Sequence, residues 1–498
     1  MSSKNWQFVS TNGGGKADDE QSRRIIRENA MRDFRRSERL ARMKEFEKQK
    51  QAQSGTEHAS THRDADAMAN RNREQQAHHD QEVVLRGCFD RSWEIMSLKG
   101  PGLGFDPFTS TVLPDHHDSQ QLFHHFVHRI APKLQPVGSN LSRISINYFL
   151  ARQILEDSGL LSTVLFHAGL HTDALSGKLW SAPTLYHHGE TVRILNERLR
   201  SPQNAISDSS VAMVGFLAAS GNITGDTQSD MAHTQALQDM IRMRGGLSNL
   251  GWQGVLAMLL LVGDSIRATI SDSRPNLSAP DIRSNRLVAE LPPSILQPAP
   301  PTIDTASLGR EIRTMMGIIT PLASTQLRLL KDPSTTISSV LSLTDLIVAV
   351  EHRLFNIKVP SPFPPEPQAL LYDSARLALT ICMSCNFRDF RPLSATLMGL
   401  QKRLMPILKS LESLYGDMTD THQRRMLLWI LWVGGIASVN QEWYAKRISV
   451  LMLELGLAEV EELRNCFREF VWSPRMDDQF SYSLWELVQS KMTLSKID

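Results

Sequence analysis

The hydrophobic pattern of the chain is organised around Met426–Val433, a run of eight apolar residues that includes two tryptophans. A helix that is apolar on every side has to be buried inside a larger body. A buried strand is the alternative, because periodicity does not separate the two for short apolar runs. Length favours a helix over Arg424–Val439, which would be about 24 Å long, with Asp420 or Thr421 as N-cap. We therefore predict a central core helix, too short for a membrane span of about 20 apolar residues, in which Gly434-Gly435 lets another backbone approach closely.

Apolar residues at helical spacing recur through most of the remaining chain, and no period-2 strand pattern of any length is present. Breaks at Ser158-Gly159 and Ser181–Pro183 divide Asn140–Leu199 into three helical segments. Short connections between helices imply antiparallel neighbours. We expect an all-α fold, a large multi-helix domain of packed antiparallel helices over residues 83–498, with a proline-rich internal loop at about 271–306. The further predicted helices are Ser207–Ser220, Asp230–Arg244, Gly254–Ile270, Gly309–Leu330, Ile337–Phe355, Gln368–Cys385, Leu393–Leu414, Gln441–Leu455 and Glu461–Trp472.

The amino-terminal part of the chain is polar. Residues 1–50 form a basic arm in which 21–50 hold eleven Lys/Arg against five Asp/Glu, and Ile26, Ala30 and Phe34 recur at four-residue steps. This pattern predicts one helix with a thin apolar stripe. Residues 51–82 are rich in Gln, Ala, His, Asp and Asn, which favours a disordered linker, because too little apolar surface is available to offset ordering entropy.

The arginines of this arm are candidate nucleic-acid contacts. A solvated helix whose arginines pair with nearby carboxylates is one interpretation. Phosphate contact or a nuclear-import signal is the other, and its residues would be Arg32, Arg35, Arg36 and Arg39. Contacts to phosphate carry affinity without base specificity. Any DNA binding by this arm is therefore expected to be weak and independent of sequence.

Composition restricts the compartment more than the activity. The net charge of +1 gives no global case for a nucleic-acid partner, so a basic surface has to be local. The four cysteines are too few and too scattered for a disulfide framework, which indicates a reducing compartment. The start of the chain has no apolar stretch typical of a secretion signal. These features favour a cytoplasmic or nuclear protein with no membrane partner.

Candidate catalytic and metal-ligating residues are few. His124 and His128 are spaced to share a metal ion, but a third ligand at useful spacing is limited to His117 or Asp118. Cys382 and Cys385 lie in an apolar run, where small buried residues are expected rather than a redox pair. No hydrolase, Rossmann or phosphate-loop motif is present. The sequence predicts no catalytic residue, no metal and no cofactor, and therefore no enzyme.

Several stretches together resemble a known family. They are Arg23–Arg32, Phe105–Ser110, His233–Leu247 with its Gly245-Gly246 end, Leu428–Gly435, Glu442–Tyr444 and Phe470–Trp472. In order and content they are similar to the fungal-specific transcription factor domain proteins, in the transcription factor-like branch that lacks the zinc cluster and whose members are often labelled tachykinin family proteins. The resemblance covers roughly residues 105–472, with the basic segment added.

The resemblance implies a nuclear regulator of transcription that acts through a helical regulatory domain. Protein partners of the transcription machinery or another regulator, weak DNA contact through the arm and a small apolar effector would follow. Wider family members bind DNA through a binuclear zinc cluster held by six cysteines, which the four cysteines here do not allow. A helical interaction or scaffold protein with no transcriptional role is the alternative, and an unrecognised enzyme is less favoured.

Overall fold

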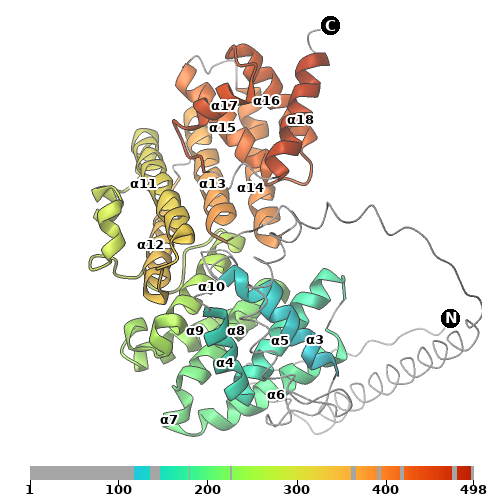
Figure 1. Cartoon of the computed structure of the whole chain (residues 1–498), viewed down its shortest axis with the longest axis vertical. Coiled ribbons are helices and arrows are strands. Elements are labelled where there is room, and N and C mark those ends of the chain that lie inside the picture. Colours follow the sequence, from blue (N-terminus) through green and yellow to red (C-terminus); the bar gives the residue numbers. More distant parts are fainter. Residues whose placement is uncertain are drawn as a thin grey trace, which may run out of the picture. The chain divides into compact units, whose positions relative to one another are not determined.

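The computed structural model describes residues 117–134, 146–178, 180–224, 227–359, 366–388, 390, 394–414, 420–473 and 479–494. These residues contain helices and no strand, so the all-α prediction is confirmed. All of them belong to one of the two compact units into which the chain divides, Gly87–Asp498. The basic arm, the linker and the loop around Phe105 lie outside the described residues. Figure 1 shows the helices in chain order from blue to red.

The amino-terminal helices pack mainly against one another, in the pairs α5 with α6, α8 with α9, and α5 with α8. They are α3 (His117–His125), α4 (Ile146–Glu156), α5 (Ser158–Leu175), α6 (Ala182–Leu199), α7 (Pro202–Ala205), α8 (Asp208–Thr224), α9 (Thr227–Met243) and α10 (Val255–Ser271).

The later helices form a second group of contacts, with α13 against α11, α14 and α15, and α16 against α15 and α18. They are α11 (Thr305–Lys331), α12 (Ile337–Asn356), α13 (Pro367–Arg388), α14 (Ala395–Ser413), α15 (Thr421–Ile436), α16 (Glu442–Glu454), α17 (Val460–Phe467) and α18 (Gln479–Leu494).

Helix α15 is the predicted core helix, shifted by three residues toward the amino terminus. Every residue from Met426 to Ile436 is buried, and Trp429 and Trp432 are 0% and 2% exposed. Asp420 caps the helix by accepting a hydrogen bond from the His422 backbone N–H at 3.1 Å. The glycine pair does permit a close approach, but the atoms that approach it belong to side chains and not to another backbone. A Cβ at Gly434 would lie 2.7 Å from Cε1 of Tyr444, and Leu484 of α18 lies equally close to Gly435.

Local chemistry explains where two predicted breaks were misplaced. The chain breaks at Asp157, whose carboxylate accepts from the Leu160 N–H at 2.9 Å and caps α5. Pro183 lies in the first turn of α6 and does not interrupt it, since a backbone N–H is not needed there. Gly159 lies inside α5, where a Cβ would be 2.8 Å from the Ile194 side chain.

The carboxyl-terminal end differs most from the sequence prediction. Helix α17 ends at Phe467, so Trp472 lies beyond it, and α18 was not predicted. Its apolar residues Leu484, Val488 and Met492 recur at four-residue steps and are buried. That spacing is the signal that could have identified the helix.

Helix α10 connects the two groups of helices, because it packs against α8, α12 and α14. Arg403 of α14 donates to the carbonyl oxygens of Thr269 and Ile270, at 2.6 and 3.0 Å. These are among the last carbonyls of α10, which have no partner within the helix itself. Asp272, which ends α10 in the left-handed conformation at φ 48°, forms an ion pair with Arg376 of α13. The end of α10 is therefore fixed to the later helices by directed polar contacts.

By length and composition alone, one helical stretch of the described chain, Trp252–Ser271, is apolar enough to cross a membrane. A core helix meets the same criterion, and 56% of this window is buried inside the structure. The loop that follows, predicted at about 271–306, holds two short 3-10 turns, Arg286–Glu290 and Pro293–Leu296, before α11 begins at Thr305.

Candidate functional site

The histidines singled out in the sequence do not form a metal site in the described part of the chain. The His124 and His128 rings lie 4.1 Å apart between centroids, while His125 Nε2 is 2.9 Å from Nδ1 of His171 on α5. No group of three or more His, Cys, Asp or Glu residues that could hold a metal occurs among the described residues. Burial lowers the pKa of His125, and the Arg129 charge lowers it further.

The two cysteines of α13 occupy the predicted core setting. Cys382 is buried, Cys385 is partly buried, and neither forms a disulfide. Burial raises the pKa of the Cys382 thiol well above its ordinary value, and the neighbouring Cys385 raises it further. A thiol held in its neutral form is a poor nucleophile and a poor metal ligand. The arginines Arg32, Arg35, Arg36 and Arg39 lie outside the described residues.

The structure instead brings together a cavity that no sequence motif predicted. It lies among α8, α9 and α10 and measures about 70 Å³. Its lining is mainly aliphatic, with a polar group of residues at one side. The lining residues are Leu134, His167, Ala212, Gly215, Phe216, Ala218, Ala219, Thr234, Leu237, Leu256, Leu259, Leu260, Gly263, Asp264, Arg267, Asn276 and Leu277.

Small residues on α8 and α10 determine the shape of this cavity. A Cβ at Gly215 would collide with Cδ2 of Leu260, so this glycine allows α8 to approach α10 closely. A Cβ at Gly263, in contrast, would meet no atom within 4 Å. Gly263 therefore faces open space in the cavity wall, and a larger side chain at this position would extend into that space.

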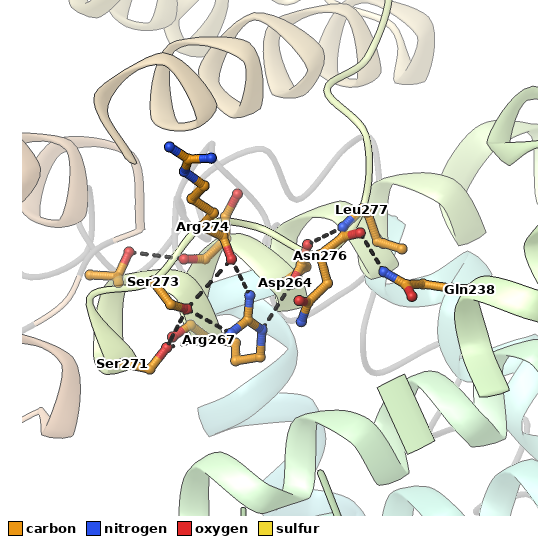
Figure 2. Close-up of polar contacts among 10 residues, drawn as sticks. Gln238, Asp264, Arg267, Ser271, Ser273, Arg274, Asn276 and Leu277 are labelled. Carbon is orange, nitrogen blue, oxygen red and sulfur yellow. Dashed lines mark hydrogen bonds and ion pairs between the residues drawn. The ribbon is translucent and has the colours of Figure 1, made fainter. Parts of the chain in front are cut away.

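Asp264 and Arg267 form the polar side of the cavity, and Figure 2 shows their contacts. Their side chains are 8% and 12% exposed, and Arg267 Nε donates to Asp264 Oδ1 at 2.9 Å. The second carboxylate oxygen, Oδ2, accepts from the Leu277 backbone N–H at 2.7 Å. The pair is thus also hydrogen-bonded to backbone, which is how charges are tolerated when they are largely removed from water.

Arg267 holds the segment Ser271–Leu277 against the cavity (Figure 2). Its Nη1 donates to Ser273 Oγ at 2.8 Å and its Nη2 to the carbonyl oxygen of Arg274 at 2.7 Å. With the Asn276 amide oxygen facing the guanidinium, that oxygen accepts from Nη2 at 3.1 Å. Gln238 of α9 fixes the same segment by donating to the Asn276 carbonyl oxygen at 2.7 Å. We call these contacts of Asp264, Arg267 and Gln238 with residues 271–277 the latch.

His167 of α5 contributes a neutral aromatic wall. Burial lowers the pKa of its imidazole to about 4, and the nearby His171 adds to the shift. Its ring lies 5.6 Å from the Phe216 ring in an edge-on arrangement, and Nδ1 is 3.4 Å from Ser220 Oγ. At neutral pH this wall is uncharged, which suits an apolar ligand.

This arrangement favours binding over catalysis. Both oxygens of the Asp264 carboxylate already accept hydrogen bonds, and a pKa of about 4 makes the His167 imidazole a weak base. A general base needs an accessible group near the reacting proton. The sequence analysis did not identify Asp264 and Arg267. The available signal was two charges three residues apart in the apolar helix Gly254–Ile270.

A model of the fungal specific transcription factor domain matches residues 121–494, which is most of the chain and includes the cavity and the core helix. No curated protein and no solved structure matches.

Proposed function

We propose that this chain, which belongs to the fungal specific transcription factor domain family, is a nuclear regulator of transcription that responds to a small apolar effector. Membership of the family supports a role in transcription regulation, implies a nuclear location and suggests a protein that is not an enzyme. The cavity among α8, α9 and α10 is the observation that supports a small apolar effector.

The walls of this cavity indicate the class of effector. Leu237, Leu256 and Leu259 present aliphatic surface, and the latch satisfies the polar groups at its side. An apolar molecule gains affinity by leaving water without breaking hydrogen bonds of the site. The space of about 70 Å³ is smaller than the engineered cavity of roughly 150 Å³ that accepts benzene. A ligand of that size would need more room, which movement of residues 271–277 and opening of the latch would provide.

Contacts at the end of α10 offer a route from the cavity to the later helices. Asp264 and Arg267, which make the latch, lie two to six residues before Thr269 and Ile270, whose carbonyl oxygens accept hydrogen bonds from Arg403 of α14. An effector that displaces residues 271–277 would also displace Asp272 and its ion pair with Arg376. A ligand shifts such an equilibrium only by its differential affinity for the two states. We propose that protein partners contact the surface that changes in this way.

Two experiments test the two parts of the proposal. A fluorescent fusion of the full chain is expected in the nucleus, and chromatin pull-down is expected to enrich defined promoters. Cytosolic fluorescence without chromatin enrichment would contradict the regulator proposal and favour the scaffold alternative.

The cavity is tested with xenon, which enters dry apolar cavities. Xenon NMR on the full chain should report binding that Gly263→Leu abolishes, because the new side chain occupies the space beside Gly263. Gly317→Leu on α11 is the matched control, since a Cβ there also meets no atom within 4 Å but lies outside the cavity lining. Equal xenon binding by both variants would refute the effector site.

We further propose the division of the chain into a basic arm at 1–50, a linker at 51–82 and a helical regulatory domain at 83–498. In the arm, Arg32, Arg35, Arg36 and Arg39 would contact DNA phosphates. Four such contacts predict a log–log slope of affinity against salt of about −3 to −4, the same for unrelated duplexes. Deleting residues 1–50 should remove this binding. Retained DNA affinity and nuclear location in the truncated protein would show that the arm has neither role.

A further inference from the structure

A second cavity lies in the carboxyl-terminal group of helices, where α15, α17 and α18 meet. In the described part of the chain, α17 and α18 both pack against α15 but do not pack closely against each other. The space between them measures about 270 Å³, whereas the first cavity, beside α10, measures about 70 Å³. The two linings share no residue. The lining residues of the second cavity are Trp432, Val460, Leu463, Arg464, Phe467, Trp472, Ser481, Tyr482 and Trp485.

Three aromatic side chains of this lining retain surface that a ligand can reach. Tyr482 and Trp485 of α18 are 65% and 9% exposed, and Trp472, which follows α17, is partly exposed. Trp432 and Phe467, in contrast, are almost fully buried. A ligand in this cavity would therefore contact mainly the rings of α18 and of the segment that follows α17.

The two buried rings form a base that holds the reachable rings in place. The ring of Trp432 lies 6.5 Å from that of Trp485 and 5.7 Å from that of Phe467, which in turn lies 5.5 Å from Trp472. Side chains that are already fixed lose little freedom when a ligand binds. Aromatic rings also attract one another in offset and edge-on contacts, beyond the effect of burying apolar area. This lining therefore favours a planar aromatic ligand over an aliphatic one of the same size.

The polar groups of the lining indicate a neutral ligand. Arg464 is the charged residue among the described lining residues, and its Nη1 lies 3.3 Å from Glu461 Oε2. Arg464 has a further interaction in addition to this ion pair, and the buried Ser481 also has a partner. A charged ligand would lose hydration on entering the cavity. Among the described lining residues it would find no unpaired charge of opposite sign in return.

We propose that the second cavity binds a neutral, planar bicyclic aromatic compound. A cavity of roughly 150 Å³ accepts a single benzene ring, so a space of about 270 Å³ accommodates two fused rings. This ligand is larger than the space of the first cavity allows, and it is recognised by rings instead of aliphatic side chains. The two sites are therefore independent, and either can exist without the other.

Equilibrium dialysis of the full chain against 2-naphthol and its saturated analogue decahydro-2-naphthol tests the proposal. Both compounds have the same skeleton and hydroxyl group, so burial of apolar surface alone predicts similar affinities. The wild-type protein should bind the planar 2-naphthol at least about tenfold more tightly. Equal affinities, or tighter binding of the saturated compound, would overturn the proposal. Tighter binding of the anion 2-naphthoate than of 2-naphthol would refute a neutral ligand.

Tyr482→Leu tests the part of the wall on α18, because it removes a ring and keeps an apolar side chain. It should reduce the preference for 2-naphthol by at least about threefold. The variant should fold with an unchanged melting temperature, since Tyr482 is largely exposed. Tyr186→Leu on α6 is the matched control, because Tyr186 lies outside this lining. An unchanged preference in Tyr482→Leu, or an equal reduction in Tyr186→Leu, would refute the site.

Trp472→Leu tests the part of the wall that follows α17, and it should reduce the same preference. Trp443→Leu on α16 is its control, because Trp443 is also partly exposed but does not line this cavity. Equal preferences in these two variants would place the ligand elsewhere. Gly263→Leu, which fills the first cavity, should not change 2-naphthol binding, so failure of one proposal is distinguished from failure of the other.

Discussion

The two cavities of this helical domain are lined by different kinds of side chain. Beside α10, glycine and alanine let helices approach closely, and the space left over is about 70 Å³. Between α15, α17 and α18, aromatic side chains, among them Trp432, Phe467 and Trp485, line a space of about 270 Å³. The two linings therefore differ in the kind of side chain that each presents.

The two cavities also differ in how their charged residues are paired. The Asp264–Arg267 pair is internal, because each partner is satisfied by the other and by residues 271–277. Arg464 forms an ion pair with Glu461 in which both side chains are more exposed. The first pair is therefore largely shielded from water, whereas the second is open to it.

The largest expected effect tests whether α15 is the rigid wall that the second cavity requires. Trp429→Ala should lower the free energy of unfolding by about 3–5 kcal/mol, because it removes a fully buried indole. The same change also breaks the hydrogen bond to Val471. Chemical denaturation measures the loss, with Trp180→Ala as control, since Trp180 is partly exposed and belongs to the amino-terminal group. Similar small losses in both variants would mean that α15 is not the core.

The next test weakens the latch of the first cavity. Asp264→Asn should lower the free energy of unfolding by about 1.5–3 kcal/mol, because it leaves the guanidinium of Arg267 largely buried and without its charge partner. Asp239→Asn on α9 is the matched control: Asp239 pairs with Arg242 at the same i,i+3 spacing, but both side chains are exposed. Its cost should be about 0.5 kcal/mol or less. Equal costs would show that the latch contributes no more than a surface pair.

Acid sensitivity should distinguish the neutral wall of the first cavity. The pKa of His167 is about 4 in the folded protein, below its ordinary 6.5. Between these values the unfolded chain binds a proton that the folded protein does not, so stability falls as the pH falls. The titration of His167 should therefore lower the free energy of unfolding by about 2 kcal/mol between pH 7 and pH 5. His167→Gln should reduce the acid dependence by this amount, measured by denaturation at several pH values, and an unchanged dependence would contradict a neutral buried imidazole.

The smallest expected effect concerns the rim of the second cavity. Arg464→Gln should change the free energy of unfolding by about 0.5 kcal/mol or less, because its pair with Glu461 is exposed. A stability loss of several kcal/mol would instead assign Arg464 a structural role and remove the contrast with Arg267.

The sequence determined the fold class and most helix positions, because helical periodicity and apolar runs are local properties. The apolar run Met426–Val433, together with the length of Arg424–Val439, predicted a buried helix. Gly245 takes the left-handed conformation, φ 81°, that is common at the end of a helix such as α9. Gly159 and Pro183 both lie inside helices, although glycine and proline weaken helices in general. Gly159 lies against the Ile194 side chain, where a larger residue would collide, and Pro183 lies in the first turn of α6, where proline is tolerated.

Only the tertiary structure decided where ligands could bind. Asp264 and Arg267 are ordinary charges in sequence, and they acquire a role only where residues 271–277 fold back onto α10. The wall of the second cavity combines α15 with α17 and the unpredicted α18, so Trp432 and Trp485 become neighbours across more than fifty residues of chain. Periodicity specifies which face of each helix is apolar, but a cavity forms where the apolar faces of different helices do not fill the space between them. Its size and charge depend on contacts between residues that no local pattern connects.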